Sequence, residues 1–142
     1  NNNINILVDH IKPKRYIKIF SACMYPAVDS DVSEEVLYQS YNPDESVKWT
    51  ALANMQDLKY LKHSDIPYDA LVVTNCYGIG DYYDDRSHVI GSVLNKMKNN
   101  SRQINLIGTG LAKRDFMYAP DLGNIIKKLL LENNSDRSLI LI

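Results

Sequence analysis

The sequence predicts an α/β fold built on a parallel sheet, and two features of the chain support that prediction. Segments with helical spacing of apolar residues alternate with short β-rich runs along the whole length. The run 69–74 is apolar almost throughout, as expected for a parallel strand that is covered on both faces. We therefore expect one domain spanning residues 1–142, in which helices flank a parallel sheet.

The helices are predicted from apolar spacing together with signals at their ends. Pro13 stops the first helical pattern, and Pro67 follows the second. Ser87 is expected to cap the third helix, which runs to about Asn99, and Pro120 opens the fourth. In chain order the expected helices are 3–12, 49–63, 87–99 and 121–132, with Trp49, Leu52, Ala53, Leu58 and Leu61 forming the apolar stripe of the second.

The strands are predicted from short β-rich runs between turn signals. In chain order they are 16–22, 69–74, 104–107 and 138–142. Residues 24–47 carry two prolines, many acids and no sustained period, so they are expected to form a long surface loop. The glycine- and acid-rich segment 75–87 is expected to form a second loop.

Polar clusters follow three of these strands, at the points where the strands end. They are Ser21-Ala-Cys23, Thr74-Asn75 and Gly108-Thr-Gly110. Ligands of open parallel sheets bind beyond the carboxyl ends of the strands. The sequence therefore predicts a single cleft at this edge of the sheet.

Several side chains near that edge can carry chemistry, and each also has a purely structural interpretation. The thiol of Cys23 can act as an acid or a base, and Ser21 can hydrogen-bond a substrate oxygen, but both residues can equally be small strand-end residues of the core. His88 can be a general acid or a surface histidine near a helix start. Lys113 and Arg114 can clamp a diphosphate or form a solvated loop pair.

Composition and charge exclude several classes of protein. Hydrophobic residues make up 45% and charged residues 23% of the chain, and the net charge is -1, so nothing indicates a nucleic-acid or membrane-surface partner. No apolar run approaches a membrane span, and the three histidines have no metal-binding spacing. The acidic cluster Asp81, Asp84 and Asp85 is expected to be solvated. The two cysteines favour the cytoplasm or another reducing compartment.

Four motif blocks occur in order along nearly the whole chain. They are Ser21-Ala-Cys-Met-Tyr-Pro26, Thr74-Asn-Cys-Tyr-Gly78, His88-Val89 and the stretch from Gly108 to Leu122. Together they resemble the second half of the nucleotide-sugar epimerase/reductases of the NAD-dependent epimerase/dehydratase family, and in particular the GDP-L-fucose synthases. The resemblance implies the second half of a Rossmann-like parallel sheet, a GDP-sugar ligand and, for the family, NADP.

The resemblance also implies roles for individual residues. Cys23 and His88 would form the acid/base pair that epimerises the sugar, and Ser21 would be a hydrogen-bond partner in the reduction. Asn75 and Arg114, with Lys113 beside it, would contact the nucleotide sugar. Helices 3–12 and 49–63 match the two that pack across a homodimer in the family, so the resemblance implies a homo-oligomer.

The chain departs from the family pattern in its redox residues. It contains no glycine-rich dinucleotide-binding turn, so no NADP platform is expected within these residues alone. The family's Tyr-x-x-x-Lys pair, which shuttles a proton during hydride transfer, falls on Thr50 and Asn54. Two further family residues, an Arg and a Trp, appear as Asn95 and Ile107.

These observations leave two functional interpretations based on the family resemblance, and a third in which the chain is unrelated to that family. In the first, the protein is a degenerate relative that retains part of the nucleotide-sugar cleft and acts as a non-catalytic binding, scaffold or structural protein. In the second, the chain is a fragment of an active NADP-dependent GDP-4-keto-6-deoxy-mannose 3,5-epimerase/4-reductase, with epimerisation alone as a narrower version. An unrelated α/β domain is disfavoured by the four ordered blocks.

Overall fold

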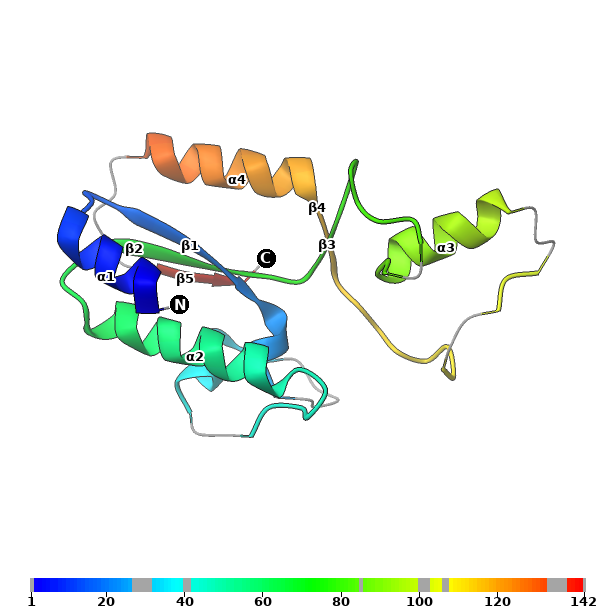
Figure 1. Ribbon diagram of the computed structural model, residues 1–142, viewed down its shortest axis with the longest axis horizontal. Helices are drawn as coiled ribbons and strands as arrows, with labels where there is room; N and C mark the ends of the chain where they lie inside the picture. Colours follow the sequence, from blue (N-terminus) through cyan, green and yellow to red (C-terminus); the bar gives the residue numbers. More distant parts are fainter. Residues whose placement is uncertain are drawn as a thin grey trace. The chain divides into compact units, whose positions relative to one another are not determined.

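The computed structural model describes residues 2–26, 32–39, 42–84, 86–99, 103–105, 108–132 and 138–141. These residues form two compact units. Unit 1 contains the chain up to Thr74 together with the part from Leu131 onward, and unit 2 is Asn75–Leu130. Each unit has a sheet of its own (Figure 1).

The sheet of unit 1 is parallel, as the sequence predicts. Its strands are β1 (Tyr16–Ser21), β2 (Tyr68–Val73) and β5 (Ser138–Leu141), in the order β1-β2-β5. All six residues of β2 are buried, which confirms the interpretation of the apolar run as a central parallel strand. The register places Ser21 beside Val73, so β1 and β2 end at the same edge.

Helix α2 (Lys48–His63) runs along one face of this sheet, and the hydrophobic core of unit 1 lies between them (Figure 1). The helix forms where the sequence predicts, but the face that it buries differs from the expected stripe. The side chain of Trp49 is 81% exposed and Leu52 is also exposed, because the buried face is set by Ala51 and Met55 together with the correctly predicted Leu58 and Leu61.

The segment 24–47 contributes to the core, so the prediction of a plain surface loop was wrong for its described residues. The 3₁₀ helix η1 (Ala22–Met24) ends at its first residue, and a second 3₁₀ helix, η2 (Glu34–Tyr38), lies within it. Met24 and Leu37 are buried in the same cluster as Phe20 of β1. Their isolated apolar side chains show no period, which is why the sequence pattern did not indicate their burial.

Helix α1 (Asn2–Ile11) is joined to α2 through polar contacts. Asn5 Nδ2 donates to Asp57 Oδ1 at 3.3 Å, and the Tyr60 hydroxyl donates to Asp9 Oδ1 at 2.5 Å and lies 3.2 Å from the Asn5 carbonyl oxygen. Burial and the hydrogen bond to Asp9 raise the pKa of Tyr60 to about 12. Lys18 of β1 completes the group by pairing with Asp57 at 3.3 Å.

Unit 2 is built around a short parallel strand pair. Its strands are β3 (Asn75–Tyr77) and β4 (Phe116–Tyr118). Its helices are α3 (Val89–Lys98) and α4 (Ala119–Leu131), of which only the last residue, Leu131, is assigned to unit 1. Neither strand was predicted, because three-residue strands leave no readable period. Helix α4 confirms the expected helix at 121–132, and Pro120 lies in its first turn.

Two other predictions for this unit need correction. Ile104 and Asn105 are in no strand, while Leu106 and Ile107 lie outside the described residues. Ser87 does not cap α3: His88 occupies the N-cap position, and the Ser87 hydroxyl donates instead to the Asp84 carbonyl at 2.5 Å. The Asp84 carbonyl competes for the hydroxyl because the chain turns back on itself just before the helix begins.

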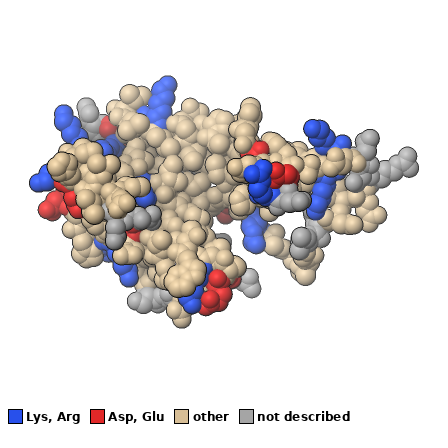
Figure 2. Space-filling model, in the orientation of Figure 1, with Lys and Arg blue, Asp and Glu red and all other residues tan. Residues whose placement is uncertain are grey.

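On the face seen in Figure 2, acidic and basic side chains are interspersed. None of the described helices is both long and apolar enough to cross a membrane.

Candidate functional site

The carboxyl end of β1 presents Ser21 and Cys23, as predicted. Ser21 is the last residue of the strand, and its Oγ accepts the backbone N–H of Cys23 at 3.3 Å. That bond caps η1 and fixes the direction in which the chain leaves the sheet. Cys23 is half-buried against the core, so its position agrees with both the chemical and the structural interpretation.

The predicted site residues of unit 2 are Asn75 and His88 on one hand and the cations Lys113 and Arg114 on the other. A hydrogen bond from Asn75 links β3 to the segment that carries the cations. Asn75 and His88 line one small hollow together with Cys76 and Phe116. The Asn75 amide donates to the Asp115 carbonyl at 2.9 Å, which holds the residue next to Arg114 against the start of β3. In unit 2, therefore, the strand end and the cationic segment are adjacent.

Lys113 and Arg114 lie in the extended stretch before β4, and both side chains are exposed. The Arg114 Nη1 donates to the Lys113 carbonyl at 3.0 Å. Gly108 and Gly110 adopt φ values of 104° and 78°, in the left-handed region that glycine tolerates without strain. The expected glycine turn is therefore confirmed, and it precedes two cations that are accessible to an anion.

The expected cleft would join Ser21 and Cys23 of unit 1 to Asn75, His88 and the cation pair of unit 2. Within unit 1 the first two strand ends do share an edge. Within unit 2 Asn75 and His88 share a hollow. A single cleft that includes both groups stays a prediction.

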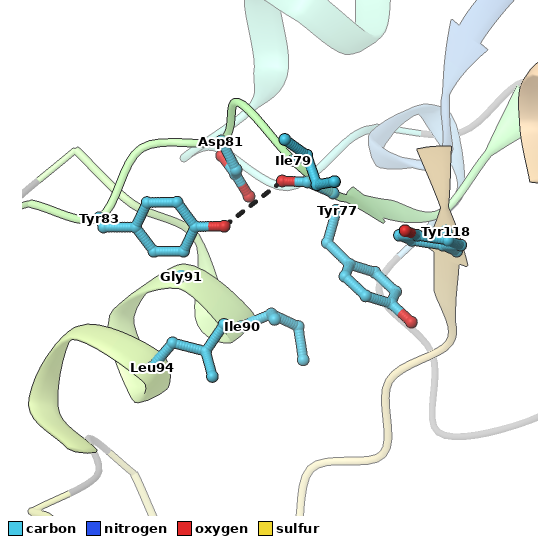
Figure 3. A pocket seen from close by; sticks show the side chains of 9 residues that line it. Tyr77, Ile79, Asp81, Tyr83, Ile90, Gly91, Leu94 and Tyr118 are labelled. Atoms are coloured by element: carbon cyan, nitrogen blue, oxygen red, sulfur yellow. Dashed lines mark hydrogen bonds between the residues drawn. The ribbon is translucent and has the colours of Figure 1, made fainter. Parts of the chain in front are cut away.

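A larger hollow in unit 2 was not predicted. Its volume is about 200 Å³, and its lining is mostly apolar. Its principal lining side chains are Tyr77, Ile79, Tyr83, Ile90, Leu94 and Tyr118, and we call it the aromatic hollow (Figure 3). The centroid of the Tyr77 ring lies 6.4 Å from that of Phe116, in an edge-on arrangement, and 5.4 Å from that of Tyr118. These ring contacts hold the Tyr77 side of the hollow in place.

Gly91 allows α3 to approach the loop that forms the other wall of the aromatic hollow. A Cβ atom at this position would lie 2.4 Å from the Tyr82 carbonyl oxygen, too close for any side chain. A glycine inside a helical pattern is the one signal in the sequence that indicates such a close approach.

Two acids of the acidic loop make specific contacts. Asp81 is half-buried and lines both hollows, and its Oδ1 accepts the Tyr82 backbone N–H at 2.8 Å. Arg86 Nη2 lies 2.6 Å from Asp84 Oδ2. Hydrogen bonds from the side chain and the backbone N–H of Arg86 lower the pKa of Asp84. Asp85 lies outside the described residues. The prediction of a simply solvated cluster was therefore wrong for Asp81.

Thr50 and Asn54 lie one turn apart on α2, at the spacing of the family's Tyr and Lys. Asn54 Nδ2 donates to the Thr50 carbonyl oxygen at 2.7 Å, so its amide bonds the helix backbone. The chain that follows β1 forms the three-residue 3₁₀ helix η1, which contains no glycine. The pyrophosphate of NADP binds at a glycine turn and a helix N-terminus, and η1 supplies neither.

Metal binding finds no support in the part of the chain that the structure describes. These residues include no group of three or more His, Cys, Asp or Glu side chains that could hold an ion.

Comparison of the sequence with known proteins identifies the family of this chain. The family model described as "NAD dependent epimerase/dehydratase family" matches residues 3–140. The chain belongs to the NAD-dependent epimerase/dehydratase family. It is 33% identical over 132 residues to the GDP-L-fucose synthase of Azorhizobium caulinodans, covering 80% of this chain and 39% of the relative. It is 28% identical over 123 residues to the GDP-L-colitose synthase of Yersinia pseudotuberculosis, covering 80% of this chain and 40% of the relative.

Solved structures of this epimerase/dehydratase fold agree with the architecture. The GDP-L-fucose synthetase of Naegleria fowleri bound to NADP matches with a TM-score of 0.76 and 18% identity, covering 99% of this chain and 49% of that chain. A UDP-glucuronic acid 4-epimerase from Bacillus cereus matches with a TM-score of 0.77 and 22% identity, covering 98% and 43%. The chain thus spans about two fifths of the length of the curated relatives and about half of these structures. Its Rossmann-like α/β fold and its likeness to GDP-L-fucose synthase are thereby established.

Proposed function

We propose that this chain forms the nucleotide-sugar-binding side of a GDP-L-fucose synthase-like protein and does not itself carry out hydride transfer. The observation on which the second part rests is the turn of α2 that holds Thr50 and Asn54. A threonine hydroxyl does not ionise near neutral pH, and an asparagine amide carries no charge that could lower the pKa of a neighbouring hydroxyl. The chain would then act as a non-catalytic binding, scaffold or structural protein.

Binding of a GDP-sugar is supported by the polar residues of unit 2. Asn75 holds the 113–115 segment beside β3, and Lys113 and Arg114 stand exposed on that segment. A guanidinium and an ammonium on one short extended stretch suit the two phosphates of a diphosphate. The guanine nucleotide is proposed because the Azorhizobium and Yersinia relatives are named for GDP-linked sugars.

The redox part of the proposal is tested by following NADPH absorbance with GDP-4-keto-6-deoxy-mannose as substrate. We expect no NADPH consumption above a protein-free control, while the Azorhizobium caulinodans relative serves as the active comparison. Calorimetric titration of the same preparation with the GDP-sugar is expected to show binding. Turnover of NADPH by the 142-residue chain would contradict the proposal.

A second function, epimerisation without reduction, is favoured by the retention of Cys23 and His88. An acid/base pair can remove the proton on a carbon next to the 4-keto group, and a solvent-derived proton returns on the opposite face. No electrons are transferred, so no cofactor is needed for this step. The observation behind it is that Cys23 lies in η1, just beyond the end of β1, and that His88 is the N-cap residue of α3, positions from which side chains can reach a ligand.

This alternative is tested in D₂O by looking for deuterium at C3 and C5 of the sugar. Exchange that disappears in both Cys23→Ser and His88→Asn would establish epimerase activity and show that the chain is catalytic after all. No exchange with the unmodified chain would eliminate the epimerase.

We also propose that the chain forms a homodimer through α1 and α2. The polar side chains of α1 bond to α2, while Ile4, Ile6, Leu7 and Ile11 are between 44% and 65% exposed. Trp49 at the start of α2 is exposed as well. Ile4, Leu7 and Ile11 follow the i, i+3, i+7 spacing of one helix face, and an exposed apolar face of this kind is typical of protein interfaces.

The dimer is tested by light scattering coupled to size-exclusion chromatography. Leu7→Glu is expected to convert the dimer to a monomer, because a carboxylate would be buried against apolar partners. Leu111→Glu is the matched control, since Leu111 is even more exposed but lies in unit 2. A monomeric wild-type chain, or equal effects of the two variants, would refute an interface at α1.

A further inference from the structure

We propose that α1 is exchanged between two copies of the chain, so that the α1 of each copy docks on the α2 of the other. The inference rests on the proposed homodimer and deepens it. It states how the two copies are joined, and it makes the turn between α1 and β1 a hinge. We call the arrangement in which α1 docks on its own α2 the closed arrangement.

Helix α1 is held on unit 1 by few contacts, and most of them are polar. Among the residues of α1 whose burial is described, only Val8 is buried. The Asn5 amide donates to Asp57 of α2. The Tyr60 hydroxyl of α2 donates to Asp9. Because every copy presents the same α2, an exchanged α1 would make each of these contacts again, and exchange costs little docking free energy.

The length of α1 indicates what it docks on after it leaves its own α2. The helix has ten residues, fewer than the roughly 12–15 that an isolated helix needs to be stable in water. Once released, it must therefore dock elsewhere or unfold. The α2 of a second copy carries the same hydrogen-bonding groups at the same spacing, so we infer that a second copy, rather than an unrelated protein, receives the helix.

The turn that follows α1 is strained in the closed arrangement. Lys12 has a φ of 50°, the only positive φ found among the non-glycine residues that the structure describes. Its backbone N–H donates to the Val8 carbonyl at 2.9 Å, which ends the helix with a left-handed cap. Glycine is the usual residue at such a cap, because a Cβ atom disfavours this conformation. Short hinges under strain favour exchange, since opening the hinge releases the strain.

The neighbours of Lys12 define the hinge as residues 12–14. Pro13 disfavours a helical conformation of Lys12, so the opened hinge becomes extended and does not prolong α1. The ion pair of Arg15 with the buried Asp69 anchors the chain just before β1. Lys12 and Pro13 line a hollow of about 300 Å³, and Lys12 and Lys14 are exposed. Little packing therefore opposes the opening of the hinge.

Exchange is tested by cross-linking α1 of one copy to α2 of another in the full chain. An Asp9→Cys chain is refolded together with a Tyr60→Cys chain, both with Cys23→Ser and Cys76→Ser, and the mixture is treated with a short bismaleimide. The two thiols replace groups that lie 2.5 Å apart. We expect a product of twice the mass of the chain on a denaturing gel, because exchange brings the two different chains together at this contact.

Two controls make the cross-link interpretable. Each single-cysteine chain alone shows the background, and we expect no product of doubled mass from it. A chain that carries both Asp9→Cys and Tyr60→Cys shows that the reagent spans the contact, because it is cross-linked in the closed and in the exchanged arrangement alike.

Lys12→Gly tests the hinge, because glycine adopts a positive φ without strain. The substitution stabilises the closed arrangement alone, and two hinges close for each dimer that dissociates. We expect the dissociation constant of the dimer, measured by analytical ultracentrifugation, to rise about thirtyfold, which is about fivefold for each hinge. Lys14→Gly is the matched control, since it adds the same flexibility to the hinge at a position without a positive φ, and it is expected to leave the constant nearly unchanged.

The outcomes separate the exchange from the proposed homodimer. A dimer in which the mixed single-cysteine chains give no product, while the chain with both cysteines is cross-linked at the mass of one chain, would overturn the exchange and leave the homodimer intact. Equal effects of Lys12→Gly and Lys14→Gly would refute the strained hinge. A wild-type chain that is monomeric throughout would refute both the exchange and the homodimer.

Discussion

Replacing Arg15 with alanine is expected to lower the free energy of unfolding by about 3–5 kcal/mol. Arg15 Nε lies 2.6 Å from Asp69 Oδ2, and the two side chains are 13% and 1% exposed. Asp69 lies in the fully buried strand β2, so the variant leaves a carboxylate in the interior without its guanidinium. The Arg15 Nη1 also donates to the Glu132 carbonyl at 2.9 Å, a contact between distant parts of unit 1 that is lost as well. Urea denaturation followed by circular dichroism measures the change.

Two comparisons isolate the buried charge as the cause. Lys48→Ala breaks an exposed ion pair with Glu45 and is expected to cost less than about 0.5 kcal/mol. The double variant Arg15→Met/Asp69→Leu removes both charges and is expected to be close to the wild type in stability. If Arg15→Ala and Lys48→Ala had equal effects, the pair would not be buried in the way described.

The sequence predicted those parts of the fold that depend on local pattern. Strand β2 was identifiable because both of its faces are buried, which makes the run almost wholly apolar. The ends of α1 and α4 were marked by Pro13 and Pro120, residues whose backbone chemistry acts within one turn.

Features that depend on contacts between distant residues could not be predicted. The Arg15–Asp69 pair joins residues 54 positions apart, and neither has a local pattern that names the other. Leu37 is a single apolar residue in a polar segment, and its burial becomes visible only once the core is assembled. The buried face of α2 was wrongly predicted for a related reason. Trp49 has the helical spacing of a buried residue, but that spacing does not show which face of the helix contacts the sheet.

The candidate site divides in the same way. The positions of Ser21 and Asn75 at and after the ends of β1 and β2 could be predicted from the strand assignments alone, whereas their role in a site stays a prediction. The aromatic hollow combines residues from β3, the following loop, α3 and β4, and only the structure brings them together. Ring contacts such as Tyr77 with Tyr118 leave no periodic signal in the sequence.

Replacing Gly91 with alanine is expected to destabilise unit 2 by about 1–3 kcal/mol, although alanine is the better helix former. The new methyl group would lie 2.4 Å from the Tyr82 carbonyl oxygen and 3.1 Å from the Ser87 Cβ. Because the first neighbour is backbone, it cannot rotate away, and α3 must move from the loop. Hydrogen exchange is expected to show reduced amide protection in α3.

Gly123→Ala provides the matched control. Gly123 lies within α4, and the structure shows no described atom within 4 Å of a Cβ placed there. The same substitution should therefore stabilise the protein by up to about 1 kcal/mol through helix propensity alone. Stability changes of opposite sign for the two substitutions would show that Gly91 is required by the approach of α3 to the Tyr82 carbonyl. This backbone contact would then set the position of α3 in the wall of the aromatic hollow. Stabilisation by both substitutions would mean that α3 does not pack against this carbonyl.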